Sequence, residues 1–129
     1  TIRSDSFSTG EGGFIAVTGS DSVSVSGADT AISAQSGGSG IGGEILITTD
    51  LFTLTNEASL DAEAFSSGDG GLILIDAPTV RNSSEARILA ELVDMVLLVV
   101  PHGKVTLDEV NASIDIIGKE KLVGLVYNN

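Results

Sequence analysis

The chain has 129 residues, enough for one ordinary domain or two very small ones. Its formal net charge of -12, from 18 acidic and 6 basic residues, argues against nucleic acid or an anionic membrane surface as a partner, because both would be repelled. The chain has no cysteine, which excludes disulfides and cysteine-ligated zinc, and its longest apolar run, residues 95–100, is too short to span a bilayer. We therefore expect no nucleic-acid partner and no direct membrane insertion. Because the chain begins at Thr1 and shows no targeting segment, we interpret it as an excerpt of a longer protein.

The composition changes near residue 71. Residues 1–71 hold 13 of the 16 glycines and 13 of the 16 serines, with ten acidic residues and Arg3 as the only base. Residues 72–129 hold eight acidic and five basic residues, so the two parts carry net charges of -9 and -3. Such a shift is typical of a domain boundary, and we predict two domains, residues 1–71 and 72–129.

The first part contains a repeat. The pattern G-x-G-G begins at Gly10, Gly40 and Gly68, at spacings of 30 and 28 residues. Short segments of alternating apolar and polar residues follow the first two instances, which is typical of the strands in one coil of a parallel β-solenoid. In such a coil the glycines permit positive φ and tight corners. The side chains expected to point inward are Ile15, Val17, Val23, Val25, Ile45, Ile47, Phe52, Leu54 and Leu60.

These units resemble the Ser/Gly/Asn-rich repeats of large secreted β-helical proteins of the filamentous haemagglutinin, two-partner-secretion type. The resemblance covers roughly residues 1–75 and rests on the repeated order of G-x-G-G, a strand such as EILITTD and a strand such as LFTLTN. It implies a β-solenoid fold and a structural, adhesin-like role, on the bacterial cell surface or in a secreted protein.

One segment of the repeats matches a nucleotide-binding motif. Residues 38–43 fit the dinucleotide fingerprint G-x-G-x-x-G, whose glycines let the backbone approach a pyrophosphate at the start of a helix. Here an alternating, β-branched segment follows instead of a helix, and glycines recur at the same place in the neighbouring units. We therefore interpret these glycines as turn residues and expect no cofactor at this segment.

The second part has the pattern of a small α/β unit. Three apolar runs, residues 72–75, 95–100 and 122–127, are separated by two helical segments, which predicts a three-stranded parallel α/β half-domain covered on both faces. The first helix is expected to start near Ser84, with Asn82 or Ser83 as its N-cap. It should bury Ile88, Leu89 and Leu92.

The second helix carries clear start and stop signals. Thr106 and Glu109 form a capping box, in which each side chain bonds the backbone of the other residue. Gly118 is a favourable terminator. The residues expected on one apolar face are Leu107, Val110, Ile114 and Ile117.

Polar residues follow each apolar run of the second part. Ligands of parallel sheets bind at the carboxyl ends of the strands, where Asp76, residues 101–104 and Asn128 would lie. Four apolar residues ending in Asp76 match the Walker B pattern, in which a buried strand holds a carboxylate near a magnesium ion.

The segments LILIDAPTV, SSEARILAELVDMVLLVV, HGKVTLDEV and KLVGLVYNN resemble the C-terminal half of the P-loop tyrosine autokinases of bacterial exopolysaccharide synthesis. The resemblance covers about residues 72–129, with the four blocks in the right order and spacing. It implies that Asp76 lies near Mg²⁺ and that Asn128 lies where the family contacts the adenine ring. It also implies a cytoplasmic location if this part governs the protein.

The parts of such a kinase that hold the phosphates are absent from the sequence. No G-x-x-x-x-G-K-[ST] loop is present, and the only tyrosine, Tyr127, falls in a predicted strand instead of a C-terminal cluster. We therefore expect no catalytic residue and no cofactor in this chain. Mg-ATP would be a ligand only if the chain were an incomplete portion of a kinase.

Structural interpretations compete with these assignments. Asp76 can be a turn residue that ends a strand before Ala77 and Pro78, and His102, without a second metal-ligating partner, is interpreted as a solvated loop residue. The repeat aligns without gaps through residue 87, so the run at 72–75 could also continue the repeats. We predict a non-catalytic, adhesin-like β-solenoid module capped by a kinase-derived segment, with self-association through the solenoid ends or the α/β edge as a further expectation. The alternative is an incomplete portion of an ATP-binding tyrosine autokinase.

Overall fold

The computed structural model describes residues 1–76 and 84–128, and it divides into two compact units, Thr1–Ala77 and Pro78–Asn129. The predicted N-caps Asn82 and Ser83 lie outside the described residues. The first unit contains eight strands: β1 (Ile2–Arg3), β2 (Phe14–Thr18), β3 (Val23–Ser26), β4 (Ala31–Ser33), β5 (Glu44–Thr48), β6 (Phe52–Thr55), β7 (Ser59–Asp61) and β8 (Leu72–Asp76). The second contains α1 (Ser84–Leu92), β9 (Val96–Pro101), α2 (Leu107–Ile117) and β10 (Leu122–Asn128).

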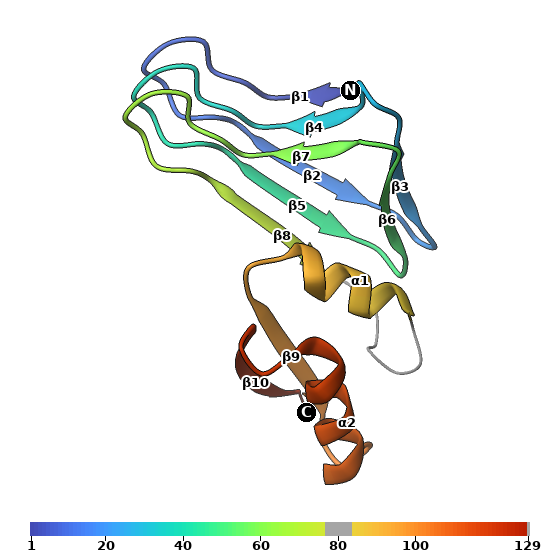
Figure 1. Ribbon diagram of the computed structural model, residues 1–129. Helices are drawn as coiled ribbons and strands as arrows, with labels where there is room; N and C mark the ends of the chain where they lie inside the picture. The colour runs from blue at the N-terminus through green and yellow to red at the C-terminus, as the bar shows by residue number, and fades with distance from the viewer. Residues whose placement is uncertain (77–83, 129) are drawn as a thin grey trace. The chain divides into compact units, whose positions relative to one another are not determined.

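Each strand of the first unit pairs with the equivalent strand of the next repeat. The sheets have the orders β1-β4-β7, β2-β5-β8 and β3-β6, and all of their pairings are parallel and in register. Ile15 is opposite Ile45, and Ile45 is opposite Ile73. Strands about thirty residues apart in the sequence therefore lie side by side, as Figure 1 shows for β2, β5 and β8.

The core of the first unit consists of aliphatic side chains from these sheets. Ile45 and Ile47 of the middle repeat are completely buried, since a repeat covers them on each side. The inward-facing prediction is confirmed: five of the nine residues are buried and the other four are half-buried. Alternation with period two therefore identified the inner face of each strand correctly.

The glycines of the G-x-G-G pattern are needed for a reason different from the predicted one. None of them has a positive φ; the positive-φ glycines are Gly27, Gly103 and Gly118. A Cβ on Gly12 would instead overlap the backbone of Ala34 and Gly43, and a Cβ on Gly42 would overlap that of Ala62 and Gly71. These glycines allow successive repeats to approach at the spacing of paired backbones.

The predicted fold class, β-solenoid coils followed by a three-stranded parallel α/β half-domain, is wrong. The described residues form four small parallel sheets, two with three strands and two with two strands, together with two helices. The run predicted as the first strand of the half-domain is β8, which pairs with β5 and not with β9 or β10. In-register pairing with the preceding repeat determines the place of this strand, because an apolar run by itself suits either sheet.

The second unit is a strand, helix, strand arrangement preceded by α1. Strands β9 and β10 pair in parallel, with a register shift between Leu122 and Gly124, and α2 connects them. The predicted capping box is confirmed: Glu109 N donates to Thr106 Oγ1 at 3.3 Å, and Thr106 N donates to Glu109 Oε2 at 2.8 Å. Gly118 ends the helix with a φ of 91°.

The carboxyl end of α1 has a partner that the sequence did not suggest. The ammonium group of Lys121 donates to the carbonyl oxygens of Ala90 at 2.8 Å and Glu91 at 2.7 Å. A cation at this end satisfies carbonyl groups that lack helical partners and interacts favourably with the helix dipole. Lys121 thus joins the start of β10 to the end of α1.

Several burial predictions for the second unit are wrong. Ile88 is 58% exposed and Leu92 62%, whereas Leu89 is half-buried. On the predicted apolar face of the second helix, Val110 and Ile117 are buried but Leu107 is 74% exposed. On β9, Val100 is buried, whereas Leu97 and Val99 on the opposite face are more than half exposed. Within the described residues the sheet of β9 and β10 is therefore not covered on both faces, and β8, which was predicted as its third strand, pairs with β5 instead.

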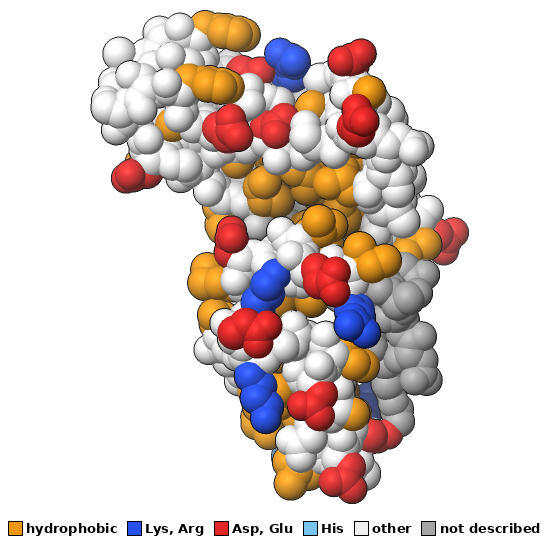
Figure 2. All heavy atoms as spheres, viewed as in Figure 1, with side chains coloured by type: hydrophobic (Ala, Val, Ile, Leu, Met, Phe, Trp, Pro, Cys, Tyr) orange, Lys and Arg blue, Asp and Glu red, His pale blue; other side chains and the backbone are white. Residues whose placement is uncertain are grey.

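No helix among the described residues is long and apolar enough to cross a bilayer. The space-filling view shows acidic side chains on the visible surface of both units (Figure 2).

Gly42 and Gly70 occupy the same position in successive repeats, which allows a matched test of the packing argument. Gly42→Ala places a Cβ against the backbone of Ala62 and Gly71, and we expect a loss of about 1–3 kcal/mol in the free energy of unfolding. A Cβ at Gly70 would come no closer than 4.0 Å to Ala62 O, so Gly70→Ala should change stability by less than about 0.5 kcal/mol. Urea unfolding in dilute solution measures both; equal losses would contradict the packing argument.

The capping box provides a second test. Thr106→Ala removes the acceptor for Glu109 N and should cost about 1 kcal/mol of stability in the second unit, followed by the loss of helical circular dichroism in urea. Thr106→Ser keeps the hydroxyl group and should lose clearly less. If the two variants were equally destabilised, the lost methyl group and not the cap would be responsible.

Candidate functional site

Asp76 is at the end of β8 and is exposed. It lies opposite Thr48 in the register, and its carbonyl oxygen accepts a hydrogen bond from Thr49 N at 3.3 Å. Among the described residues no group of three or more histidines, cysteines or acidic side chains could hold a metal ion. The assignment of Asp76 to Mg²⁺ therefore rests on the sequence resemblance alone and stays a prediction.

Asn128 is at the end of β10, opposite Pro101, and its side chain is exposed. Its carbonyl oxygen accepts from His102 N at 2.8 Å, which closes the loop after β9. The carboxyl ends of β9 and β10 are therefore adjacent, as the sequence predicted. The proposed adenine contact of Asn128 stays a prediction.

The fold does not place these two residues at the edge of one sheet. Asp76 belongs to the sheet β2-β5-β8, whereas Asn128 belongs to β9-β10. A Walker B carboxylate lies beside the ends of the strands that bind the rest of the nucleotide. The sheet that contains Asp76 does not include β9 or β10, the strands that would contribute the rest of such a site. The other candidate, His102, is exposed in the loop after β9, as the sequence predicted.

The G-x-G-G corners line a groove of about 410 Å³, contributed by all three repeats. Its glycine N–H groups already have backbone partners: Gly12 N donates to Ile41 O at 2.9 Å, and Gly43 N donates to Ala34 O at 2.6 Å. Glu11 and Glu44 stand on its walls, and strand β5 follows Gly43. Strand β5, and not a helix, follows the fingerprint glycines, so residues 38–43 do not stand at the start of a helix, where a dinucleotide fingerprint would hold a pyrophosphate.

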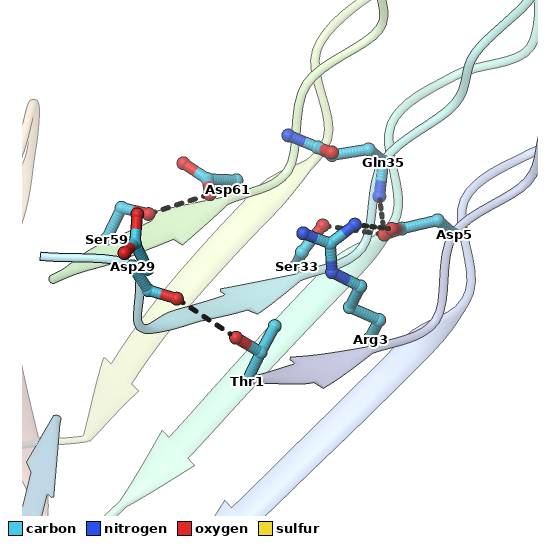
Figure 3. Close-up of polar contacts among 8 residues, drawn as sticks. All are labelled: Thr1, Arg3, Asp5, Asp29, Ser33, Gln35, Ser59 and Asp61. Atoms are coloured by element: carbon cyan, nitrogen blue, oxygen red, sulfur yellow. Dashed lines mark hydrogen bonds and ion pairs between the residues drawn. The ribbon is translucent and has the colours of Figure 1, made fainter. Parts of the chain in front are cut away.

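A buried polar cluster connects the first two repeats, and Figure 3 shows its side chains. Asp5 Oδ1 accepts from Ser33 Oγ at 2.6 Å and from Gln35 N at 3.0 Å. The side chain of Asp5 is only 5% exposed, and its Oδ2, which accepts no hydrogen bond, lies 3.7 Å from Arg3 Nη1. The arrangement connects β1 to the strand of the following repeat.

This cluster was missed by sequence reasoning, which treated the acidic residues of the first part as a solvated face. The repeat alignment contains a signal for it: Asp5 is equivalent to Gln35 and Glu63, and Arg3 to Ser33 and Asp61. Only in the first repeat is this position an aspartate, and its carboxylate accepts hydrogen bonds from Ser33 Oγ and Gln35 N of the next repeat. With a single carboxylate and a neighbouring guanidinium, the cluster has a structural role and no metal-ligand set.

Substitution of Asp5 tests this role. Asp5→Ala leaves Ser33 Oγ and Gln35 N without their acceptor, and we expect a loss of about 1–3 kcal/mol in the free energy of unfolding. Asp21 is exposed, and Asp21→Ala should change stability by less than about 0.5 kcal/mol. Chemical unfolding of the two variants provides the comparison. An Asp5→Ala variant as stable as Asp21→Ala would show that the hydrogen bonds of Asp5 to Ser33 and Gln35 do not stabilise the fold.

Comparison of the chain with protein-family models, with curated proteins and with solved structures found no match.

Proposed function

We propose that this chain is a non-catalytic structural module of a surface or adhesin-like protein. The observation that supports the proposal most directly is the in-register pairing of three repeats. Because equivalent residues are opposite each other, each repeat presents a similar outer surface. Such a surface suits an extended structural element better than a site that must bring different chemical groups to one point.

The outer side chains of the repeats are consistent with this role. On the sheet β3-β6, Ser24 is opposite Thr53 and Ser26 is opposite Thr55, while the alternate residues face the core. Asn56 Nδ2 donates to Ser26 Oγ at 2.8 Å across the repeats. Short hydroxyl and amide groups in register form a rigid polar surface that does not supply a nucleophile with a base beside it.

The partners of such a module follow from its charge and its strands. A net charge of -12 disfavours nucleic acid, because phosphates would be repelled. Self-association through open strand edges is the partner that the arrangement favours, and a location on the cell surface or in a secreted protein agrees with the structural role.

A second candidate function has one observation in its favour. Strand β9, helix α2 and strand β10 follow the order of the C-terminal blocks of the tyrosine autokinases of exopolysaccharide synthesis, with Asn128 at the carboxyl end of β10. An ATP-binding portion of such a kinase would also need a phosphate loop and a carboxylate beside these strands. The sequence has no such loop, and Asp76 belongs to another sheet.

Calorimetric titration of the purified chain with Mg-ATP distinguishes the two candidates. The structural module should give no binding heat, whereas a dissociation constant below about 100 μM would refute it in favour of the kinase portion. Asp76→Asn and Asn128→Ala serve as matched variants. Under the kinase interpretation each should weaken nucleotide binding, and under the structural interpretation each should titrate like the unaltered chain.

A further inference from the structure

Two aromatic side chains of the first unit project from its loops into solvent. Phe7, between β1 and β2, is 89% exposed, and Phe65, between β7 and β8, is 65% exposed. Figure 2 shows hydrophobic side chains on the visible surface of this unit. Burial in the core does not explain either phenylalanine. Exposed apolar side chains that lie close together are typical of an interaction site.

The two phenylalanines occupy the same position of the repeat. Gly37 N donates to Ser6 O at 2.7 Å, and Phe65 N donates to Ser36 O at 2.9 Å. Both hydrogen bonds belong to parallel bridges between successive repeats. Phe7, Gly37 and Phe65 are therefore equivalent residues of three adjacent backbones, whose loops are stacked at one end of the unit in Figure 1.

The middle repeat has no side chain at this position. Gly37 is exposed and has no positive φ, and a Cβ there would come no closer than 3.2 Å to Ser6 O and 3.4 Å to Phe7 Cα. A larger side chain would therefore lie beside Phe7, in the space that the glycine leaves open. We call this space, with Gly37 at its base and Phe7 and Phe65 on its two sides, the phenylalanine notch.

The width of the phenylalanine notch follows from the spacing of the repeats. At about 4.8 Å for each repeat, the backbones that carry Phe7 and Phe65 are about 9.6 Å apart. Because apolar carbon atoms pack at about 3.5–4.0 Å, a flat ring between two phenyl rings needs about 7–8 Å, and a puckered ring needs more. The pyrrolidine ring of proline is puckered and largely apolar. The notch therefore has the width for one such ring.

The same spacing matches the period of a proline-rich helix. A polyproline II helix has three residues per turn and rises about 3.1 Å per residue, so equivalent residues are about 9.3 Å apart. A peptide lying across the repeats with one proline in the notch would place the residues three positions before and after it on the outer sides of Phe7 and Phe65. Prolines at every third position would thus alternate with the two phenyl rings.

Hydroxyl groups surround the phenylalanine notch. The loop segments 6–10, 36–40 and 64–68 contain no charged residue. Their exposed residues with hydroxyl groups are Ser8, Thr9, Ser39, Ser66 and Ser67. A hydroxyl group can donate to a carbonyl oxygen, and a polyproline II segment offers its carbonyl oxygens because it has no internal hydrogen bonds.

The charges beside these loops favour a basic ligand. The carboxylates of Glu11, Glu63 and Asp69 are exposed and lie directly outside the neutral segments in the sequence. No lysine or arginine occurs in residues 4–71 to offset them. Lysine or arginine side chains between the prolines of a peptide would therefore be attracted to this end of the unit.

We propose that the phenylalanine notch binds a basic, proline-rich peptide in the polyproline II conformation, with one proline between Phe7 and Phe65. Docking of proline rings against exposed aromatic side chains is an established mode of peptide recognition, because the preformed helix loses little entropy on binding. The site is independent of the structural role proposed above, since it needs only the three loops, and Mg-ATP titration does not report on it.

Calorimetric titration with synthetic peptides tests the site. The probe is a capped peptide of four Pro-Pro-Lys units, and the control is a capped peptide of four Ala-Ala-Lys units, which has the same charge and no proline rings. The proline peptide should have a dissociation constant at least about tenfold lower than that of the alanine peptide. Equal affinities would overturn the proposal, because the negative charge of the protein alone would then explain the binding.

Substitutions in the loops test the position of the peptide. Phe7→Ala and Phe65→Ala should each weaken binding of the proline peptide at least about tenfold, while circular dichroism stays unchanged because both side chains are exposed. Gly37→Leu should abolish binding by filling the notch between the two rings. Phe14→Ala is the matched control: Phe14 is also exposed, but it lines the groove of the G-x-G-G corners. It should bind the peptide like the unaltered chain.

Two further results would overturn the proposal. If Phe7→Ala and Phe65→Ala bound the proline peptide as well as the unaltered chain, or if only Phe14→Ala lost binding, the peptide would lie outside the notch. Cellohexaose, titrated in parallel, tests a different ring-shaped ligand. Binding of cellohexaose that Phe7→Ala abolishes, together with no binding of the proline peptide, would assign the notch to a sugar instead.

Discussion

The first unit depends on one constraint, the close parallel approach of equivalent backbone segments in successive repeats. At the corners, Gly43 N donates to Ala34 O at 2.6 Å within a repeat, and Glu44 N donates to Gly13 O at 2.9 Å across to the preceding one. Strands at a spacing of about 4.8 Å leave no room for a Cβ at these corners, which is why the pattern G-x-G-G recurs. Once the corners are in register, the inward aliphatic side chains stack on their equivalents and the outward hydroxyl groups form rows. The core, the polar surface and the buried contact of Asp5 with the second repeat all follow from that register.

The second unit is stabilised by different interactions. Among its described residues the buried apolar side chains are those of Ala90, Val100, Val110 and Ile117, and its sheet consists of two strands. A two-stranded sheet is marginal by itself, so contacts at the helix ends carry more weight here than in the first unit. The capping box of Thr106 and Glu109 fixes the start of α2, and Lys121 satisfies the last carbonyl groups of α1. Exposed apolar side chains such as Leu97 and Val99 remain on the face of β9 opposite Val100.

Local sequence patterns predicted those features of the structure that depend on residues close together in the chain. Period-two alternation identified the inner faces of the repeats, and the Thr106–Glu109 pair located the start of α2, because both signals act within a few residues. The place of the run at 72–75 is a long-range property. Its apolar residues suit a strand of either sheet, and only its alignment with residues 44–48 of the preceding repeat indicates β5 as its neighbour. The prediction that Ile88 and Leu92 are buried was wrong for the same reason. It assumed a third strand beside β9 and β10, and that strand, β8, belongs to another sheet. The role of Asp5 required both its spacing in the repeat and the identity of the residues one repeat later.

Pairing also decides what the carboxylates of this chain can do. Asp5 and Asp76 both stand next to a strand of the first unit, yet Asp5 is buried against donors of the next repeat, whereas Asp76 is exposed at the end of the last one. Among the described residues, Asp76 and Gly70 have backbone neighbours from the preceding side only, and a following repeat would supply those of the other side. The segment that begins SGDGG and continues as LILID therefore belongs to the repeats over its whole length, and Asp76 has the position of a strand-end residue. In a nucleotide site the same carboxylate would need a phosphate loop and the ends of β9 and β10 beside it. The sheet pairing of β8 thus favours a structural carboxylate over a magnesium ligand.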